Sequence, residues 1–325
     1  MAEPLTRLVA VDAGGTTTRA AVVHPAGRCL GYAVAGSGNP TAVGPETAAA
    51  AVAESVMVAL GRAEVPGTRI RLVVLAMAGA SSTTVAAQIR RRLAGIGLDA
   101  PLVFESDLLA TYFSGTHRPA GYAVIAGTGA GAIRVEDGRQ VAVADALGWL
   151  LGDEGSGFWI GQRVVRAALA DLDGRGPSTA LTPRMLARLG VPAPSDPGDR
   201  EPIMAVMRAL YAGPPVRLAD YAGLVFEVDG DETVDRILDD AAAALARTLA
   251  AVRSPTVSGP VVLGGGILGR GRQVADRLAA ACGVEQVHAV TDGAVGVSVL
   301  TLRHAGTYVD AAMFQQLTTS LAAVL

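Results

Sequence analysis

The N-terminal part of the chain alternates short apolar runs with tight turns before any helical periodicity begins. Residues 8–12 (LVAVD) are apolar and β-branched, and residues 17–23 and 28–34 repeat that character after an AGGT turn and an HPAG turn. Such runs, joined by turns rich in Gly and Pro, predict a three-stranded antiparallel meander. The elements predicted next are helices over 45–64 and 82–94 and strands over 72–76 and 102–105.

The second half of the chain opens with the same order of elements. GYAVIA at 121–126 leads into a Gly-Thr-Gly turn, and 130–146 carries two more strand-like runs around an Asp-Gly turn. This similarity indicates an internal duplication, which would aim two Gly-Thr turns at one cleft. Beyond it we predict helices over 157–171, 203–212, 232–252, 272–282 and 309–323, a strand over 260–263, and loop with short helices over the Pro-rich stretch 174–202.

Length and composition narrow the class of protein. A chain of 325 residues exceeds the usual size of one hydrophobic core, which favours two domains with a ligand cleft between them. Apolar residues make up 50% and charged residues 18%, which favours a globular protein. The net charge of -3 does not indicate the concentrated positive charge that binding to nucleic acid or anionic lipid would need.

The cysteine and histidine usage bears on compartment and metals. Cys29 and Cys282 form no CxxC pair, which is typical of a reducing compartment, and no leader or membrane-spanning stretch is evident. We therefore expect a cytoplasmic protein. The four histidines are dispersed without metal-ligand spacing, so no zinc is expected.

Two Gly-Thr turns are candidates for binding phosphate. The segment 12–17 (DAGGTT) places a carboxylate at a strand end, followed by glycines and hydroxyls. Glycines let backbone N–H groups approach phosphate oxygens, and Asp12 could hold Mg²⁺ directly or through water. An ordinary hairpin turn is the alternative interpretation. Residues 127–129 (GTG) are less specific by themselves and gain weight from their matched position in the repeat.

Two further strand ends carry candidate chemistry. Residues 263–267 (LGGGI) lie between a predicted strand and a predicted helix, where a flat heterocycle could lie against the backbone; a tight turn is the alternative. The run matches neither the Rossmann nor the P-loop pattern. Residues 105–107 (ESD) follow an apolar strand, and Asp107 could act as the general base for a sugar hydroxyl or simply cap a helix.

The most specific segment is 148–157 (GWLLGDEGSG). The segment contains four glycines, two adjacent carboxylates and an aromatic ring, a composition that disfavours both a helix and a strand. They suit a loop that wraps a polyhydroxylated ligand, with carboxylates accepting hydroxyl hydrogen bonds and Trp149 forming one wall.

Together, DAGGT, ESDxxA, GTG, GWLLGDEGS and the late GGG resemble the BadF/BadG/BcrA/BcrD ATPase family and its N-acetylglucosamine and glucosamine kinases, within the sugar kinase and actin-like ATPase superfamily. The resemblance implies an α/β fold of two RNase H-like domains around a nucleotide and sugar cleft, use of ATP and Mg²⁺, and a homodimer. We expect the domains to comprise residues 1–115, completed by 306–325, and residues 116–305.

The resemblance also implies a role for each candidate residue. The phosphates would contact Asp12, Gly14, Gly15, Thr16, Thr17, Thr128 and Gly129. Asp12 would also hold the metal. The adenosine would contact Gly264, Gly265 and Gly266. The sugar would contact Asn39, Asp107, Gly148, Trp149, Asp153 and Glu154, with Asp107 as the catalytic base.

Two departures from the family pattern bear on the substrate. Ala130 follows GTG where relatives often have serine, and Asp145 and Leu147 precede Gly148 where kinases of acetamido sugars tend to be uncharged and rich in glycine. Carboxylates near the sugar favour a free amine, so the prediction is phosphorylation of the 6-hydroxyl of glucosamine, with N-acetylglucosamine as the alternative.

Two other classes of function are weighed against this one. An ATPase activator of a radical dehydratase would need an iron–sulfur cluster, which two isolated cysteines do not favour. A sugar-sensing regulator would need a DNA-binding module, and the strand predicted to begin near Leu8 leaves no room for one before it.

Overall fold

The computed structural model describes residues 6–77, 83–196, 198–270, 272–283, 287–291 and 293–324. The chain divides into two compact units. The first unit comprises Met1–Pro119, Asp137–Arg139 and Asp292–Leu325, and the second comprises Ala120–Glu136 and Gln140–Thr291. Among the described residues, no helix combines the length and apolar character needed to cross a bilayer.

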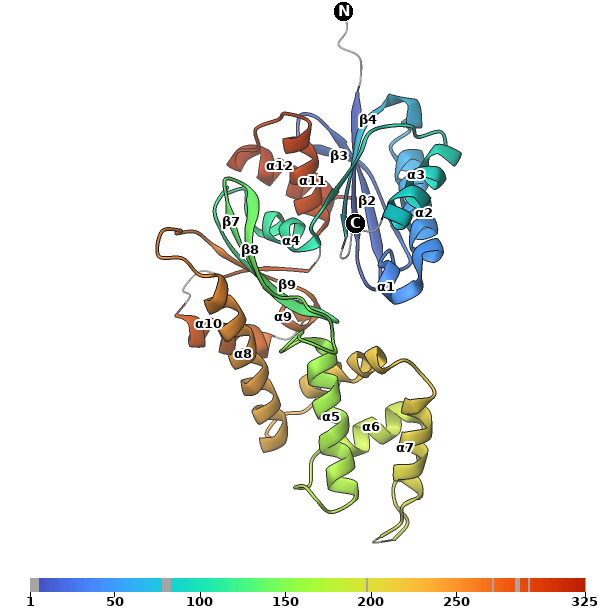
Figure 1. Cartoon of the computed structure of the whole chain (residues 1–325), viewed down its shortest axis with the longest axis vertical. Coiled ribbons are helices and arrows are strands. Elements are labelled where there is room, and N and C mark those ends of the chain that lie inside the picture. The colour runs from blue at the N-terminus through green and yellow to red at the C-terminus, as the bar shows by residue number, and fades with distance from the viewer. Residues whose placement is uncertain are drawn as a thin grey trace, which may run out of the picture. The chain divides into compact units, whose positions relative to one another are not determined.

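The first unit is built on a five-stranded sheet of order β3-β2-β1-β4-β5 (Figure 1). Its strands are β1 (Arg7–Ala13), β2 (Thr18–His24), β3 (Arg28–Ala35), β4 (Ile70–Met77) and β5 (Leu102–Glu105). The first three form the predicted antiparallel meander, and β4 and β5 extend it in parallel with β1. Its helices are α1 (Pro40–Val43), α2 (Pro45–Arg62), η1 (Gly67–Arg69), α3 (Thr83–Gly95), α4 (Asp107–Gly115), α11 (Ala294–His304) and α12 (Ala311–Ala322).

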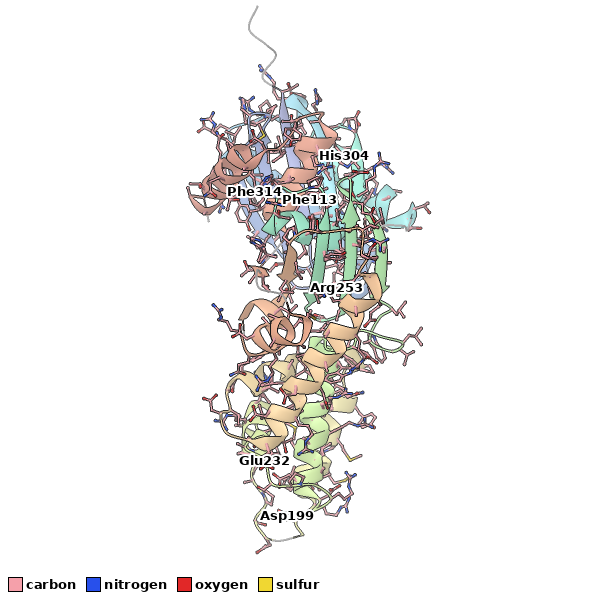
Figure 2. The ribbon with its side chains drawn as sticks, turned by 90° about the vertical axis from the view of Figure 1, so that its left-hand side faces the viewer. Phe113, Asp199, Glu232, Arg253, His304 and Phe314 are labelled. Carbon is pink, nitrogen blue, oxygen red and sulfur yellow. The ribbon has the colours of Figure 1, made fainter. Side chains whose placement is uncertain are left out.

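Helices cover both faces of this sheet. In Figure 1, α2 and α3 lie on one face, and α4, α11 and α12 lie on the other. The central strands β1 and β4 are therefore almost wholly buried, as their continuous apolar sequences require. Phe113 of α4 is fully buried within this unit (Figure 2).

The second unit repeats this topology. Its sheet has the order β10-β9-β6-β7-β8, in which β6 and β7 are antiparallel and β9 and β10 extend the sheet in parallel with β6. The strands are β6 (Gly121–Ala126), β7 (Ala130–Glu136), β8 (Arg139–Asp145), β9 (Val261–Gly264) and β10 (Val287–Val290). Two sheets of matching strand order agree with the predicted duplication.

A helical layer packs against the second sheet. It consists of α5 (Gly157–Leu172), α6 (Leu181–Leu189), α7 (Glu201–Tyr211), η2 (Pro215–Phe226), α8 (Glu232–Val252), α9 (Gly266–Arg270) and α10 (Arg272–Cys282). One continuous apolar core joins the sheet to this layer, including Val124, Val164 and Leu245. The Pro-rich stretch 174–202 contains α6 and the start of α7, between connections without regular structure.

The first unit extends further in the sequence than we expected. Helix α11 was not predicted, and residues before 306 were assigned to the second domain. In the structure, a Cβ on Gly296 would lie 1.6 Å from the Ala110 carbonyl oxygen, so α11 packs directly against α4. The Gly296 amide also donates to the Ser114 hydroxyl (2.9 Å). In the structure the described residues from 293 to 305 belong to the first unit, whereas we expected that unit to resume at residue 306.

Several short elements were also not predicted, among them η1 and α9, which are three and five residues long. Strand β10 is four residues long and only partly buried, so it has too little pattern to detect. Element η2 is a 3₁₀ segment, for which the helical period of 3.6 residues is the wrong template. Helix α1 is a single turn.

Candidate functional site

The carboxyl ends of three parallel strands meet at one edge of the first sheet. Asp12 of β1 pairs in register with Ala76 of β4, and Ala76 pairs with Glu105 of β5. Adjacent strands lie about 4.8 Å apart, which puts the backbones of Asp12 and Glu105 roughly 10 Å apart. Asp107 begins α4 two residues later. The first unit therefore brings Asp12 and Asp107 to the same edge.

Asp12 is a buried carboxylate, 7% exposed, with donors around it. Its Oδ2 accepts a hydrogen bond from the Gly293 amide (3.0 Å), and the Arg19 guanidinium lies 3.8 Å away. Gly293 is the N-cap of α11, where a negative charge interacts favourably with the helix dipole. A Cβ on Gly293 would lie 2.8 Å from Asp12 Oδ1, so a larger residue here would displace the Asp12 carboxylate.

The DAGGTT turn is held in shape by backbone hydrogen bonds. The Gly14 amide donates to the Thr17 carbonyl (2.9 Å), while Gly15 and Thr16 are exposed. The segment carrying Asn39 packs on this turn, because the Gly38 amide donates to the Gly14 carbonyl (3.2 Å). Asn39 uses its Oδ1 to cap α1, accepting from the Thr41 amide (2.9 Å).

Asp107 is the first residue of α4. Its Oδ1 accepts from the Leu108 amide (3.0 Å), and the N-cap position itself is Ser106. Burial raises the pKa of the Asp107 carboxyl above its ordinary value, and the Leu108 hydrogen bond acts in the opposite direction. A carboxylate with a raised pKa is a better proton acceptor, as a general base requires.

In the second unit, the GTG turn and the GGG turn lie side by side. Ile125 of β6 pairs with Gly264 of β9. Gly265 has φ +88°, and a Cβ there would lie 2.4 Å from the Ala126 carbonyl oxygen. By contrast, a Cβ on Gly127 or Gly266 would meet no atom within 4 Å. Protein packing does not require glycine at those two positions, and their open backbone fits the close approach of a flat ligand.

The start of α5 fixes the GTG turn. The Ser156 side chain caps the helix, accepting from the Trp159 amide (3.2 Å). The Gly157 amide then donates to the Gly127 carbonyl (2.7 Å), and the Phe158 amide donates to the Thr128 carbonyl (3.2 Å). Two backbone bonds thus join the helix start to the turn, while Thr128 stays exposed.

The loop from Asp145 to Gly155 is strained and internally clamped. Asp145, Ala146 and Asp153 all have positive φ, between 56° and 61°. Non-glycine residues rarely adopt this conformation, and such strain gathers at functional sites. Asp145 holds the loop closed, since its Oδ1 accepts from the Asp153 amide (2.7 Å) and its Oδ2 from the Glu154 amide (2.9 Å). The sequence had suggested Asp145 as a partner for a sugar amine; in the structure it clamps the loop.

The predicted sugar-side residues of this loop have different surroundings. Asp153 is buried against the GTG turn, and a Cβ on Gly129 would lie 2.7 Å from Asp153 Oδ2. Burial and the nearby Asp145 charge raise the pKa of the Asp153 carboxyl. Glu154 is exposed and pairs with Arg247 of α8 (3.2 Å). Trp149 is 38% exposed, next to Gly148, and its ring centroid lies 5.2 Å from that of Phe158.

Sequence reasoning missed Gly293 and Arg19 beside Asp12. A signal for Gly293 was available, because the run DGAVG at 292–296 has the glycine-rich character of the other turns. Arg19 of β2 lies directly opposite Asp12 of β1, a pairing that can be seen only once the register of the hairpin is known.

Two units that each carry an antiparallel meander extended by parallel strands define the fold of the sugar kinase and actin-like ATPase superfamily. A glucokinase of the ROK family from Streptomyces griseus, solved with glucose and an ATP analogue, has the same fold, with a TM-score of 0.55 over 91% of this chain at 19% identity. More particularly, residues 9–301 match the model of the BadF/BadG/BcrA/BcrD ATPase family, and the chain belongs to that family.

Named relatives are kinases of amino sugars. The chain is 27% identical over 250 residues to an N-acetyl-D-glucosamine kinase of Dictyostelium discoideum, a match that covers 73% of this chain and 76% of the relative. It is also 27% identical over 175 residues to an N-acetylmuramic acid/N-acetylglucosamine kinase of Clostridium acetobutylicum, covering 54% of this chain and 57% of that protein. A candidate N-acetylglucosamine kinase from Chromobacterium violaceum is similar in structure, with a TM-score of 0.73, 26% identity, and coverage of 92% of this chain and 100% of that one.

Proposed function

We propose that this chain is an ATP-dependent kinase that transfers the γ-phosphoryl group of ATP to the 6-hydroxyl of an amino sugar, with N-acetylglucosamine as the preferred acceptor. The observation that carries the proposal is the placement of Asp12 and Asp107 at one sheet edge of the first unit, beside a Gly-Thr turn with exposed residues. Kinase chemistry needs one carboxylate for the metal and phosphates and another for the acceptor hydroxyl.

Asp107 would act on the sugar. Its carboxylate takes the proton of the 6-hydroxyl as that oxygen forms a bond to the γ-phosphorus, and the bond from this phosphorus to the β,γ-bridging oxygen breaks to release ADP. Burial raises the Asp107 pKa and so strengthens the base. The Leu108 hydrogen bond holds one carboxylate oxygen in place.

Asp12 and the turns would hold the phosphates. Mg²⁺ binds through one or two protein carboxylates together with phosphate oxygens, so the buried carboxylate of Asp12 could supply one ligand to this ion. When bound, Mg²⁺ would neutralise charge on the transferred phosphoryl group. The chain contains no lysine, so the cationic side chain beside this carboxylate is Arg19. The open backbone at Gly127 and Gly266 supports placing the nucleotide on the second unit.

The relatives and the loop both support the choice of acceptor. The named kinases act on N-acetylated amino sugars, which supports N-acetylglucosamine. The sequence-based preference for glucosamine rested on carboxylates available to an ammonium group. Asp145 is occupied by two backbone amides and Glu154 by Arg247, so that preference has less support than the alternative.

The experiment is a comparison of acceptors. ADP release with ATP and Mg²⁺ is measured for N-acetylglucosamine, glucosamine and glucose, and the product is identified by phosphorus NMR. We expect the highest kcat/KM for N-acetylglucosamine and a 6-phosphate product. A higher kcat/KM for glucosamine would reverse the choice of acceptor, and ADP release that no sugar stimulates would remove the kinase proposal.

A further inference from the structure

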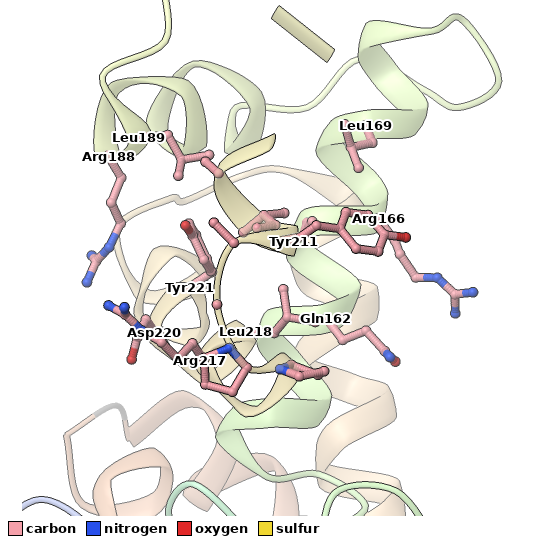
Figure 3. Close-up of a pocket in the computed structure, with 17 residues that line it drawn as sticks. Gln162, Arg166, Leu169, Arg188, Leu189, Tyr211, Arg217, Leu218, Asp220 and Tyr221 are labelled. Atoms are coloured by element: carbon pink, nitrogen blue, oxygen red, sulfur yellow. The ribbon is translucent and has the colours of Figure 1, made fainter. Parts of the chain in front are cut away.

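A cavity in the helical layer of the second unit is separate from every candidate residue described above. Its volume is about 810 Å³, and it is bordered by α5, the ends of α6 and α7, and the start of η2 (Figure 3). Pockets of roughly 300 to 1,000 Å³ are typical of small-molecule sites. The cavity is thus large enough for a ligand of nucleotide size.

The wall of the cavity is apolar and partly aromatic. Val165, Leu169 and Leu218 contribute aliphatic surface, and the rings of Tyr211 and Tyr221 also line it. Tyr211 is 85% exposed, an uncommon state for a large aromatic side chain, whereas Tyr221 is buried. A flat ring bound here would cover the exposed face of Tyr211.

The rim carries positive charge. Arg166, Arg188 and Arg217 line the cavity, and Asp220 is the acidic residue among the lining side chains. Asp220 pairs with Arg217 at 3.3 Å, which leaves a local excess of two positive charges on a chain whose net charge is -3. Burial and the Asp220 charge raise the pKa of the Tyr221 hydroxyl, while Arg188 and Arg217 both lower it, so the charges of both guanidinium groups reach this ring.

The cavity is also preorganised. Pro214 and Pro215 fix the backbone of the turn between α7 and η2. A Cβ on Gly161 would lie 1.9 Å from the Leu218 carbonyl oxygen, so η2 packs against α5 at backbone distance and the wall cannot shift freely. A rigid site loses less entropy when a ligand binds.

We infer that this cavity is a second ligand site, which binds an organic phosphate with a flat ring: the phosphate lies on the arginine rim and the ring lies against Tyr211 and the apolar wall. Arginine suits phosphate because its planar guanidinium donates two parallel hydrogen bonds. Nothing in the proposed phosphoryl transfer uses these residues, so the site is additional to that reaction.

The test uses riboflavin 5′-phosphate as a fluorescent probe on the full-length protein with Mg²⁺ but without ATP, because ATP is itself an organic phosphate with a flat ring and would compete for the cavity. We expect the protein to quench the probe fluorescence in a saturable way. Riboflavin, which lacks the phosphate, should bind at least about tenfold more weakly than the probe. N-Acetylglucosamine 6-phosphate, which has no flat ring, forms a third arm and should compete poorly. Strong competition by it would overturn the flat-ring assignment.

Variants locate the binding. The double variant with Arg188→Ser and Arg217→Ser should bind the probe at least about tenfold more weakly than the wild type. Tyr211→Ala should reduce the quenching. Arg236→Ser changes an exposed arginine of α8 outside the cavity and should leave the affinity within about twofold. Equal affinity in the double variant and the wild type would overturn the inference.

Sugar-dependent ADP release is measured in the same variants and should be unchanged. Normal ADP release without probe binding would overturn the second site and leave the kinase standing. Probe binding in a protein that phosphorylates no sugar would overturn the kinase and leave the second site standing.

Discussion

Replacing Asp145 with Asn separates the two roles considered for this residue. In the structure, its two carboxylate oxygens accept the amides of Asp153 and Glu154 at 2.7 and 2.9 Å. Asparagine offers one carbonyl oxygen and turns an NH₂ group toward the other amide. Two charge-assisted hydrogen bonds of about 1.5 to 3 kcal/mol each are then replaced by one neutral bond of about 1 kcal/mol.

The expected loss follows from these values. Glu154 is exposed, so the lower end of the range applies, and the closed loop loses about 2 kcal/mol, or roughly 30-fold in its population relative to open forms. The clamp acts on the loop and not on a sugar substituent. We therefore expect kcat/KM for N-acetylglucosamine, glucosamine and glucose to fall together, by up to about 30-fold, with their ratios unchanged within about twofold.

The assay is steady-state ADP release for all three sugars with wild type, Asp145→Asn and the control Asp137→Asn. Asp137 also has positive φ, in the β7–β8 turn, so the control makes the same chemical change in a similar backbone conformation. The control should match wild type. A loss confined to glucosamine would refute the clamp and restore Asp145 as the partner of a sugar amine.

Three further predictions concern stability, metal and pH. Gly296→Ala should lower Tm, because the Cβ of the new alanine would lie 1.6 Å from the Ala110 carbonyl oxygen. Overpacking of this kind costs about 1 to 3 kcal/mol of stability. An unchanged Tm would contradict the close packing of α4 against α11. Asp12→Asn should abolish turnover while calorimetry still detects sugar binding; loss of sugar affinity with ATP affinity intact would reassign Asp12 to the sugar. Because burial raises the Asp107 pKa in the folded state, ionising Asp107 costs stability as pH rises from about 4 through that raised pKa. Asp107→Asn should therefore have a higher Tm than wild type at pH 7.5, with the difference vanishing towards pH 4; an equal Tm at both pH values would contradict the raised pKa.

Most strands and helices could be predicted because their patterns are local. The apolar run of β1 and the Gly-Thr turn after it carry their own signal, and the repeated strand order in the second half pointed to the duplication. Helix α11 is different. Its residues up to Leu302 are mostly small or apolar and nearly all buried, so no polar face marks it as an amphipathic helix. Its place in the first unit depends on the close packing of Gly296 against α4, a contact between residues far apart in the sequence.

The candidate site shows the same division. Residue types at strand ends indicated Asp12, Asp107 and the glycine turns from the sequence alone. The occupation of each carboxylate could not be predicted, since it depends on contacts made only in the folded loop. Asp145 looked available to a ligand, and the structure shows both of its oxygens bound to backbone amides.

The central claim is that Asp107 accepts the proton of a sugar hydroxyl during phosphoryl transfer. The most direct measurement compares kcat of Asp107→Asn with that of wild type on N-acetylglucosamine, together with the sugar Kd from calorimetry. The proposal predicts a fall in kcat of about 10²- to 10⁴-fold, with Kd changed by no more than about twofold. Turnover close to that of wild type in a variant that binds sugar normally would contradict it.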